Sequence, residues 1–345
     1  MVVEPESFCW SSGRLVNKRD GPTWADELRG YSSLEYIVRD GGTGLSKGIS
    51  LIQAERPQLR DGLDVFHTLH EGVKALRQTW SAASRALEAA DTEQKRFDRL
   101  GRQGKSRQGK GGPLKRAWDK AEQRMDQADH AEQAFGQIKQ ALALFTPEGK
   151  LNDRTRAERI IREQLAHLTG PQWNKTRRFL QRPETFTFLD RLHEALGRLQ
   201  IDENELDAAL RFEGLRRCRW LWRDETPQAA AARGLVMVET VRLQKDRRWQ
   251  DVIAQVRRTL RGCWRASSLV EGINSVARMH QSRHRKMTQG LLDLKRLYWN
   301  MRPFRTGRRR GKSPYALFDL KLPTDDWWEL LRLPPDQLAQ HLSTQ

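Results

Sequence analysis

The stretch from Leu34 to His67 constrains the fold more than any other part of the chain. Ile37 and Val38 belong to a short apolar, β-prone run that stops at Asp40, and this pattern predicts a buried strand. Two glycines follow, so the backbone can turn sharply and leave the Asp40 carboxylate exposed at the strand's carboxyl end. Asp-Gly is also common in ordinary turns, and on local sequence alone a simple turn explains Asp40 equally well.

A helix and a second strand are expected next. The helix carries an apolar stripe at spacings of four and three: Leu45, Ile49 and Ile52. Thr43 can cap this helix, and Leu63–Phe66 is predicted to form a second buried strand ending at His67. The result is a strand-helix-strand unit with parallel strands. Chemistry in such sheets tends to sit at the carboxyl ends of the strands, where Asp40 and His67 would both lie.

Charge and cysteine content narrow the class of protein. The 345 residues carry a formal net charge of +18, which draws a chain to polyanions, with nucleic acid the leading candidate and a membrane surface the weaker one. No apolar run approaches the roughly 20 residues that span a bilayer, and the start of the chain lacks the pattern of a signal peptide. The three cysteines fit a reducing cytoplasm, here nucleoid-associated, and exclude a Cys-rich zinc module.

The chain order predicts a small sheet followed by a helical body. Residues 1–10 open as a strand, Arg14–Asn17 is expected to return antiparallel to it, and a short helix runs from Thr23 to Leu28. From 70 to 262 the apolar residues recur at helical spacing without a convincing strand. Two long helices form an antiparallel pair there, and a single helix is expected from Thr226 to Gly262.

Two basic segments are the candidate contacts to DNA. Gly101–Pro113 interrupts the long helices and is expected to be a solvated loop or a loop that also touches phosphate. The second segment lies in the tail, where the rings of Tyr315, Phe318, Trp327 and Trp328 are expected to pin the tail to the body more than to stack on bases. The candidate DNA-binding residues are Arg102, Lys105, Arg107, Lys110, Arg305, Arg308, Arg309, Arg310 and Lys312.

A second carboxylate of interest begins a later helix. Ser268 and Glu271 match a capping box, which could by itself explain Glu271. Glu271, Asn274 and Arg278 nevertheless share one polar stripe opposite an apolar face, and this combination suits metal and phosphate. His280 and His284 have the spacing of paired metal ligands, but they fall on the apolar side, where core histidines are the better interpretation.

These motifs together resemble a DDE-type transposase of a bacterial insertion sequence, from the Mutator-like and hAT-like branches. Ile37-Val38-Arg39-Asp40-Gly41 resembles the strand end that bears the second acid, and Asp64-Val65-Phe66-His67 resembles the C/D-x-x-H motif. Ser268-Leu-Val-Glu271-Gly-Ile-Asn274 resembles the helix that bears the last acid. Tyr298-Trp-Asn300-Met-Arg302 and Gly311-Lys-Ser-Pro314-Tyr resemble the ends of such transposases.

The resemblance implies an α/β fold that is helix-dominated overall. It has a ribonuclease-H-like core, incomplete at the N-terminus, with a large all-α insertion. The implied domains are a first part of the core (1–69), an all-helical insertion (70–262) with a basic loop (99–113), returning core helices (263–302), and a basic and aromatic tail (303–345). The implied activity is metal-dependent cleavage and strand transfer of double-stranded DNA, at transposon ends and target, by a homodimer or higher oligomer.

The implied site holds two Mg²⁺ ions, or Mn²⁺, on Asp40 and Glu271 as catalytic metal ligands. Asp64, His67, Asn274 and Arg278 are implied in supporting roles, with Asp64 orienting His67. In the family a first acid sits on a strand that is missing here, so the chain is expected to be truncated at its N-terminus and a poor nuclease. Glu4 on the opening strand is the alternative third ligand.

The sequence leaves two other functions open. The chain could be a non-catalytic DNA-binding remnant or scaffold derived from a transposase, which its charge supports equally well. It could also be a helical interaction protein without a nucleic-acid role, and DNA affinity that does not fall with salt would favour that function.

Overall fold

The computed structural model describes residues 1–266, 268–283 and 287–343, and gives only the backbone for 268–269, 277, 279–283 and 343. About 66% of the chain is helical and 5% is strand, so the expectation of a helix-dominated chain is confirmed. None of the described helices is both long and apolar enough to cross a bilayer. The described strands form two separate two-stranded sheets.

The chain divides into two units. Unit 1 contains Met1–Glu35, Gly42–Leu59 and Ala266–Gln345, and unit 2 contains Tyr36–Gly41 and Arg60–Arg265. This division differs from the ranges expected from sequence. The strands Tyr36–Arg39 and Arg60–Leu63 group with the helical body, whereas the helical segment between them, Gly42–Leu59, groups with the two ends of the chain.

Unit 1 is built around one short antiparallel strand pair. β1 (Val2–Val3) pairs with β2 (Trp10–Ser12). Its helices are α1 (Gly21–Arg29), α2 (Thr43–Glu55), α11 (Ser268–Arg283), α12 (Gln289–Met301), α13 (Pro314–Leu317), α14 (Trp327–Arg332) and α15 (Pro335–Ser343). The predicted return strand at Arg14–Asn17 is wrong, since the return strand is β2.

The side chain of Asn300 explains why the return strand lies earlier than predicted. Its amide oxygen accepts the Trp10 N–H at 2.8 Å, and its amide nitrogen donates to the Trp10 carbonyl at 3.0 Å. Trp299 on the same helix donates its indole N–H to the Phe8 carbonyl. A partner 290 residues away thus satisfies the backbone of β2, and local sequence carries no sign of it. A small buried core beneath this contact consists of Trp10, Ile273 and Leu292.

Unit 2 begins with a parallel strand pair. β3 (Tyr36–Arg39) and β4 (Arg60–Leu63) pair in register from Tyr36 with Arg60 to Arg39 with Leu63, so the predicted strand-helix-strand unit with parallel strands is confirmed. The predicted second strand at Leu63–Phe66 is wrong. Asp64 ends the strand instead, because its carboxylate accepts the backbone N–H of His67 at 2.9 Å and caps the next helix.

Eight helices make up the rest of unit 2. They are α3 (Val65–Arg102), α4 (Gly111–Ala141), α5 (Arg154–Gln164), α6 (Asn174–Leu180), α7 (Thr187–Gly197), α8 (Glu203–Leu215), α9 (Pro227–Lys245) and α10 (Arg247–Gly262). Single 3-10 turns η1 (Leu165–His167), η2 (Pro171–Trp173), η3 (Pro183–Thr185) and η4 (Trp220–Trp222) lie between them. All of residues 70–262 are described, and this range contains no strand, as expected.

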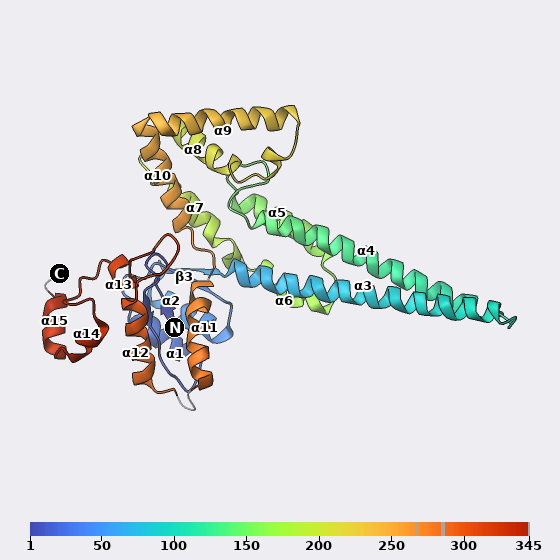
Figure 1. Cartoon of the computed structure of the whole chain (residues 1–345), viewed down its shortest axis with the longest axis horizontal. Helices are drawn as coiled ribbons and strands as arrows, with labels where there is room; N and C mark the ends of the chain where they lie inside the picture. Colours follow the sequence, from blue (N-terminus) through green and yellow to red (C-terminus); the bar gives the residue numbers. More distant parts are fainter. Residues whose placement is uncertain (267, 284–286, 344–345) are drawn as a thin grey trace. The chain divides into compact units, whose positions relative to one another are not determined.

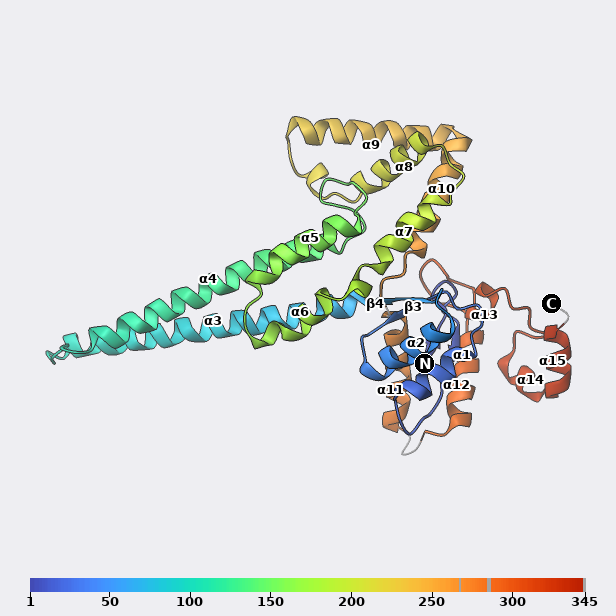
Figure 2. The ribbon, with the colours of Figure 1, turned by 180° about the vertical axis from the view of Figure 1, so that it is seen from behind.

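The two longest helices form an antiparallel hairpin, as predicted. Figures 1 and 2 show α3 and α4 side by side along their length, with the connecting loop at the free end. The facing positions are small and fully buried: Ala83 and Ala90 on α3, and Ala121, Ala128 and Ala131 on α4. Side chains this small let two helix backbones approach closely, and the hairpin is therefore a narrow rod that projects its loop away from the rest of unit 2.

The starts of two helices differ from the prediction. The helix expected from Thr226 to Gly262 is broken at Asp246, whose carboxylate accepts the Trp249 N–H and starts α10. Thr43 is the first residue of α2 and does not cap it, since Gly42 occupies the cap position without a side-chain hydrogen bond. Apolar periodicity continues through Asp246 and reports the buried face of a helix, but it does not report where the backbone hydrogen bonds are interrupted.

Candidate functional site

Asp40 lies where the sequence places it, directly after β3. Its side chain is exposed, whereas the preceding Arg39 is buried. Gly41 has a φ of 79°, which L side chains rarely adopt. A Cβ at Gly41 would also lie 3.0 Å from the ring of Phe179. The turn after β3 therefore requires glycine, both for its backbone conformation and for its close approach to Phe179. The same turn leaves the Asp40 carboxylate exposed at the end of a parallel strand pair.

Asp64 and His67 form a local pair at the end of the neighbouring strand. The Asp64 side chain is fully buried, and its second oxygen lies 2.8 Å from the ring Nδ1 of His67. One carboxylate thus caps α3 and fixes the ring of a histidine in the first turn, with about a quarter of the histidine side chain exposed. His67 lies on the helix and not on a strand, which corrects its predicted position.

Glu271 belongs to a polar stripe on α11. Its carboxylate accepts from Arg278 at 3.3 Å, and both side chains are substantially exposed. Asn274 lies between these two residues in the sequence, and its side chain is half-buried. Ile273 is buried in the core of unit 1. Asp40 lies in unit 2 and Glu271 in unit 1, and their joint role as metal ligands stays a prediction. The His280 side chain and all of His284 lie outside the described residues.

Glu4, the alternative third ligand, has a local structural role. Its two oxygens accept the backbone N–H groups of Glu6 at 2.8 Å and Ser7 at 2.7 Å, and one also accepts the Ser7 hydroxyl. This carboxylate therefore holds the turn after β1. Across the part of the chain that the structure describes, no group of three or more His, Cys, Asp or Glu side chains is placed to hold a metal ion.

Burial raises the thiol pKa of all three cysteines and so disfavours the thiolate. Burial raises the pKa of the Cys9 thiol to about 11, with a smaller contribution from the nearby Glu4 carboxylate. Burial likewise raises the pKa of the Cys263 thiol to about 11. Both are thiols and not thiolates at neutral pH, and only the thiolate is the reactive and metal-binding form.

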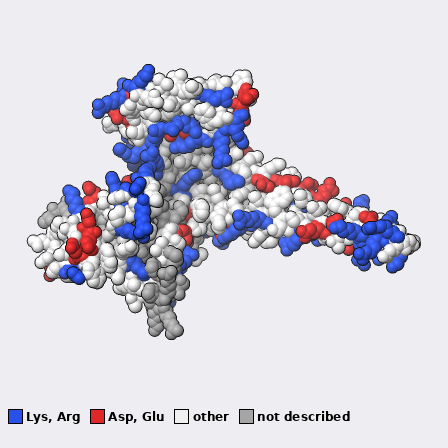
Figure 3. Space-filling model, in the orientation of Figure 1, with Lys and Arg blue, Asp and Glu red and all other residues white. Residues whose placement is uncertain are grey.

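The free end of the hairpin concentrates positive charge. Eight Lys or Arg side chains between 99 and 120, here called the basic tip, are all exposed: Arg99, Arg102, Lys105, Arg107, Lys110, Lys115, Arg116 and Lys120. Asp119 is the one acid in this range. Within the described chain none of the eight forms an ion pair; the nearest pairs on the hairpin are Lys95 with Asp91 and Arg96 with Glu93. Figure 3 shows this end of the hairpin covered by basic side chains.

The basic tip has some internal order. Arg107 lies with its guanidinium carbon 4.7 Å from the centre of the Phe97 ring, a cation–π contact that leaves the guanidinium able to donate hydrogen bonds outward. The loop itself is shorter than expected, because α3 extends to Arg102 and α4 starts at Gly111. The predicted loop residues Lys105, Arg107 and Lys110 lie in it, and Arg102 ends the helix before it.

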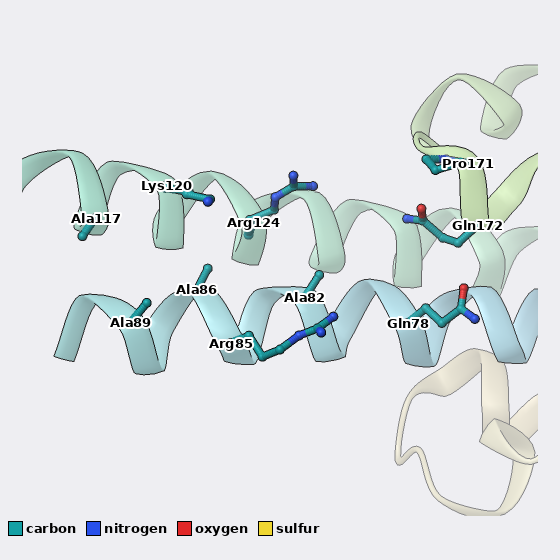
Figure 4. Close-up of a pocket in the computed structure, with 10 residues that line it drawn as sticks. All are labelled: Gln78, Ala82, Arg85, Ala86, Ala89, Ala117, Lys120, Arg124, Pro171 and Gln172. Carbon is teal, nitrogen blue, oxygen red and sulfur yellow. The ribbon is translucent and has the colours of Figure 1, made fainter. Parts of the chain in front are cut away.

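A groove runs between the two helices below the tip. It has a volume of about 720 Å³ and is lined by Gln78, Ala82, Arg85, Ala86, Ala89, Ala117, Lys120, Arg124, Pro171 and Gln172. Figure 4 shows alanines of α3 and α4 along the groove and the cations Arg85, Lys120 and Arg124 beside them. Lys120 belongs to both the groove and the basic tip, so positive charge continues from the loop down the side of the hairpin.

The basic tail divides into two kinds of residue. Arg305, Arg308, Arg310 and Lys312 are exposed. Arg309 instead donates to the backbone carbonyls of Pro5 and Glu6 and packs 4.3 Å from the Phe8 ring centre, and partial burial lowers the pKa of its guanidinium. This side chain therefore fastens the tail to the turn after β1, and its expected contact with DNA stays a prediction.

The tail aromatics also divide. Trp327 packs edge-on against Tyr298 of α12 with ring centres 5.8 Å apart, which is the pinning role expected for these rings. Phe318 and Trp328 are each about half exposed.

Two buried charge clusters were not found by sequence reasoning. Arg39, 4% exposed, binds Asp61 at 2.6 Å and Glu184 at 3.0 Å. Glu213, 6% exposed, lies within 3.5 Å of three arginines: Arg216, Arg217 and Arg257. Arg216 and Arg217 follow Glu213 by three and four residues, a spacing that could have indicated their contact. No local signal identifies Arg257, or the partners of Arg39.

No protein-family model, curated protein or solved structure matches this chain.

Proposed function

We propose that this chain binds duplex DNA through the basic tip of the α3–α4 hairpin, as the DNA-binding body of a transposase-type protein. The observation that carries the proposal is the set of eight exposed cations, without ion pairs among the described residues, at the end of a projecting rod. Cations already paired with carboxylates gain little from a phosphate, whereas unpaired ones release counterions from DNA when they bind. The +18 net charge supports the same partner.

The side chains of the basic tip favour contacts to DNA phosphates over recognition of base edges. Lys and Arg dominate its exposed surface. The Phe97 ring is already occupied by Arg107, and the partly exposed Trp118 donates its indole N–H to Gln94. Base-specific recognition requires side chains held at base edges, and contacts to the phosphates alone carry no sequence information. We therefore propose binding with little sequence preference by this surface.

A salt titration tests this proposal. We expect the affinity of the chain for a duplex of arbitrary sequence to fall steeply as salt rises, with a slope in log K against log salt of up to about −7 if all eight cations contact phosphate. Fluorescence anisotropy at several salt concentrations measures the slope. A flat response would exclude phosphate contacts as the source of affinity and favour a helical interaction protein.

A second candidate function is metal-dependent DNA cleavage and strand transfer by a DDE-type transposase. The observation in its favour is the exposed Asp40 carboxylate at the end of a parallel strand pair, beside the Asp64–His67 pair. The described side chains do not by themselves assemble three metal ligands, and Glu4 is engaged in its own turn. The described residues therefore do not by themselves make a complete two-metal site.

One assay separates the two candidate functions. Nicking of supercoiled DNA is measured with Mg²⁺ or Mn²⁺ for the chain and for Asp40→Asn and Glu271→Gln. We expect all three proteins to bind duplex DNA with the same salt dependence, because neither acid belongs to the basic tip. Metal-dependent nicking that is lost in both variants would establish the enzyme, whereas nicking unchanged by Asp40→Asn would exclude this site.

A further inference from the structure

Helix α9 has apolar side chains on two opposite faces. The inner face packs into a core of unit 2 through Val236, Ala232 and Leu235. The outer face consists of six residues that are all exposed: Ala230, Ala231, Gly234, Met237, Val238 and Val241. Met237 and Val238 are 63% and 64% exposed, and no residue of the outer face is charged. A row of exposed apolar side chains along one helix face is typical of an interaction surface, so we infer that the outer face has a partner.

The spacing of the outer face is that of a two-helix seam. Ala231, Gly234, Val238 and Val241 follow one another at intervals of three, four and three, the repeat with which helices pack along each other. The small residues lie in the first half of the seam and the larger ones in the second half. A Cβ at Gly234 would meet nothing within 4 Å, so the space above this position is open to a partner's side chain.

Because of this order, the seam is complementary to itself in an antiparallel arrangement. When two copies of α9 are placed antiparallel and centred near residue 236, Gly234 of one lies opposite Val238 of the other, and Ala231 lies opposite Val241. Each large side chain then meets a small one, as packing of helix ridges into grooves requires. In a parallel arrangement, small residues would face small ones and large residues would face large ones.

The charges at the two ends of α9 point to the same arrangement. Asp224 and Glu225 precede the helix, and Lys245 and Arg247 lie at and just after its end; all four side chains are exposed. No ion pair joins any of the four to a described residue. Figure 3 shows acidic side chains at one end of this region, basic ones at the other and uncharged surface between them. An antiparallel pair would set each acidic end against a basic end, and opposed helix dipoles favour it further.

We propose that the outer face of α9 binds a second copy of this chain in an antiparallel two-helix contact. The contact would be about 28 Å long for a helix of 19 residues. It is smaller than a standard stable interface, so we expect a dimer in the micromolar range. This inference does not depend on DNA binding.

Sedimentation equilibrium of the full chain tests the proposal. We expect an average mass approaching twice 40.1 kDa at tens of micromolar protein. Val238→Asp should raise the dimer dissociation constant more than tenfold, because two carboxylates would be buried against the seam. Leu87→Asp on α3, at another exposed apolar side chain, is the matched control and should leave the constant unchanged. Circular dichroism verifies that both variants keep their helix content.

Charge reversal tests the direction of pairing without touching the seam. Lys245→Glu with Arg247→Glu should weaken the dimer, and so should Asp224→Lys with Glu225→Lys, because each change places like charges together. All four changes in one chain should restore the dimer. A wild-type chain that stays monomeric, a dimer unaffected by Val238→Asp, or a fourfold variant no tighter than the two double variants would each overturn the proposal.

Discussion

Replacing Glu213 by Gln is expected to lower the free energy of unfolding of unit 2 by about 3 kcal/mol, at the lower end of the cost of breaking a buried ion pair. The Glu213 carboxylate is nearly inaccessible, and it lies 2.8 Å from Arg257 and 3.1 Å from Arg216. A neutral amide would leave these guanidinium groups and Arg217 close together without their common anion. The arginines are partly exposed, and water therefore compensates for some of the loss.

Denaturant unfolding monitored by circular dichroism measures the effect. The matched control is Glu163→Gln, which removes an exposed pair with Arg159 at 3.1 Å and should cost less than about 1 kcal/mol. Equal losses in the two variants would mean that burial of the Glu213 carboxylate contributes nothing to stability. A larger loss for Glu213→Gln than for the control is the expected result.

Removing four charges from the basic tip should weaken duplex binding about 100-fold or more at moderate salt. The variant carries Arg102→Gln, Lys105→Gln, Arg107→Gln and Lys110→Gln, all at exposed positions. Each lost phosphate contact lowers the steepness of the salt dependence by about 1, so the slope should fall by about 4. The fold should survive, because none of these side chains is buried.

The control for this variant removes the same net charge from other parts of the chain. Arg29, Lys74, Arg159 and Arg248 each form an ion pair with a carboxylate, and their fourfold replacement by Gln should weaken binding far less and leave the slope nearly unchanged. If the two fourfold variants lose affinity equally, net charge and not the basic tip determines binding.

The sequence predicted the parts of the fold that depend on local pattern. Ile37 and Val38 with the glycines after Asp40 indicated the first strand of the parallel pair and the exposed acid at its end, and apolar spacing indicated the long hairpin. The errors have two causes. The distant Asn300 selects Trp10–Ser12 as the return strand, whereas Asp64 and Asp246 act locally as N-caps and start helices inside runs whose apolar pattern continues.

The candidate site shows the same division. The basic tip could be read from composition, since exposed cations in a Gly-rich loop need no partner to be recognised. Arg309 could not be assigned, because its contacts with Pro5 and Glu6 lie about 300 residues away in sequence. The roles of Glu4 and Glu213 also follow from partners that only the folded chain brings together.

The most direct test of the basic tip as the DNA-binding surface is photo-crosslinking from the loop itself. Benzoylphenylalanine at position 108 replaces Gln108, an exposed residue between Arg107 and Lys110, and the same group at the exposed Ala254 of α10 is the control. With duplex DNA at low salt, we expect crosslinks from position 108 that disappear as salt rises, and few from position 254. DNA that binds the chain but crosslinks at position 254 and not at 108 would contradict the proposal.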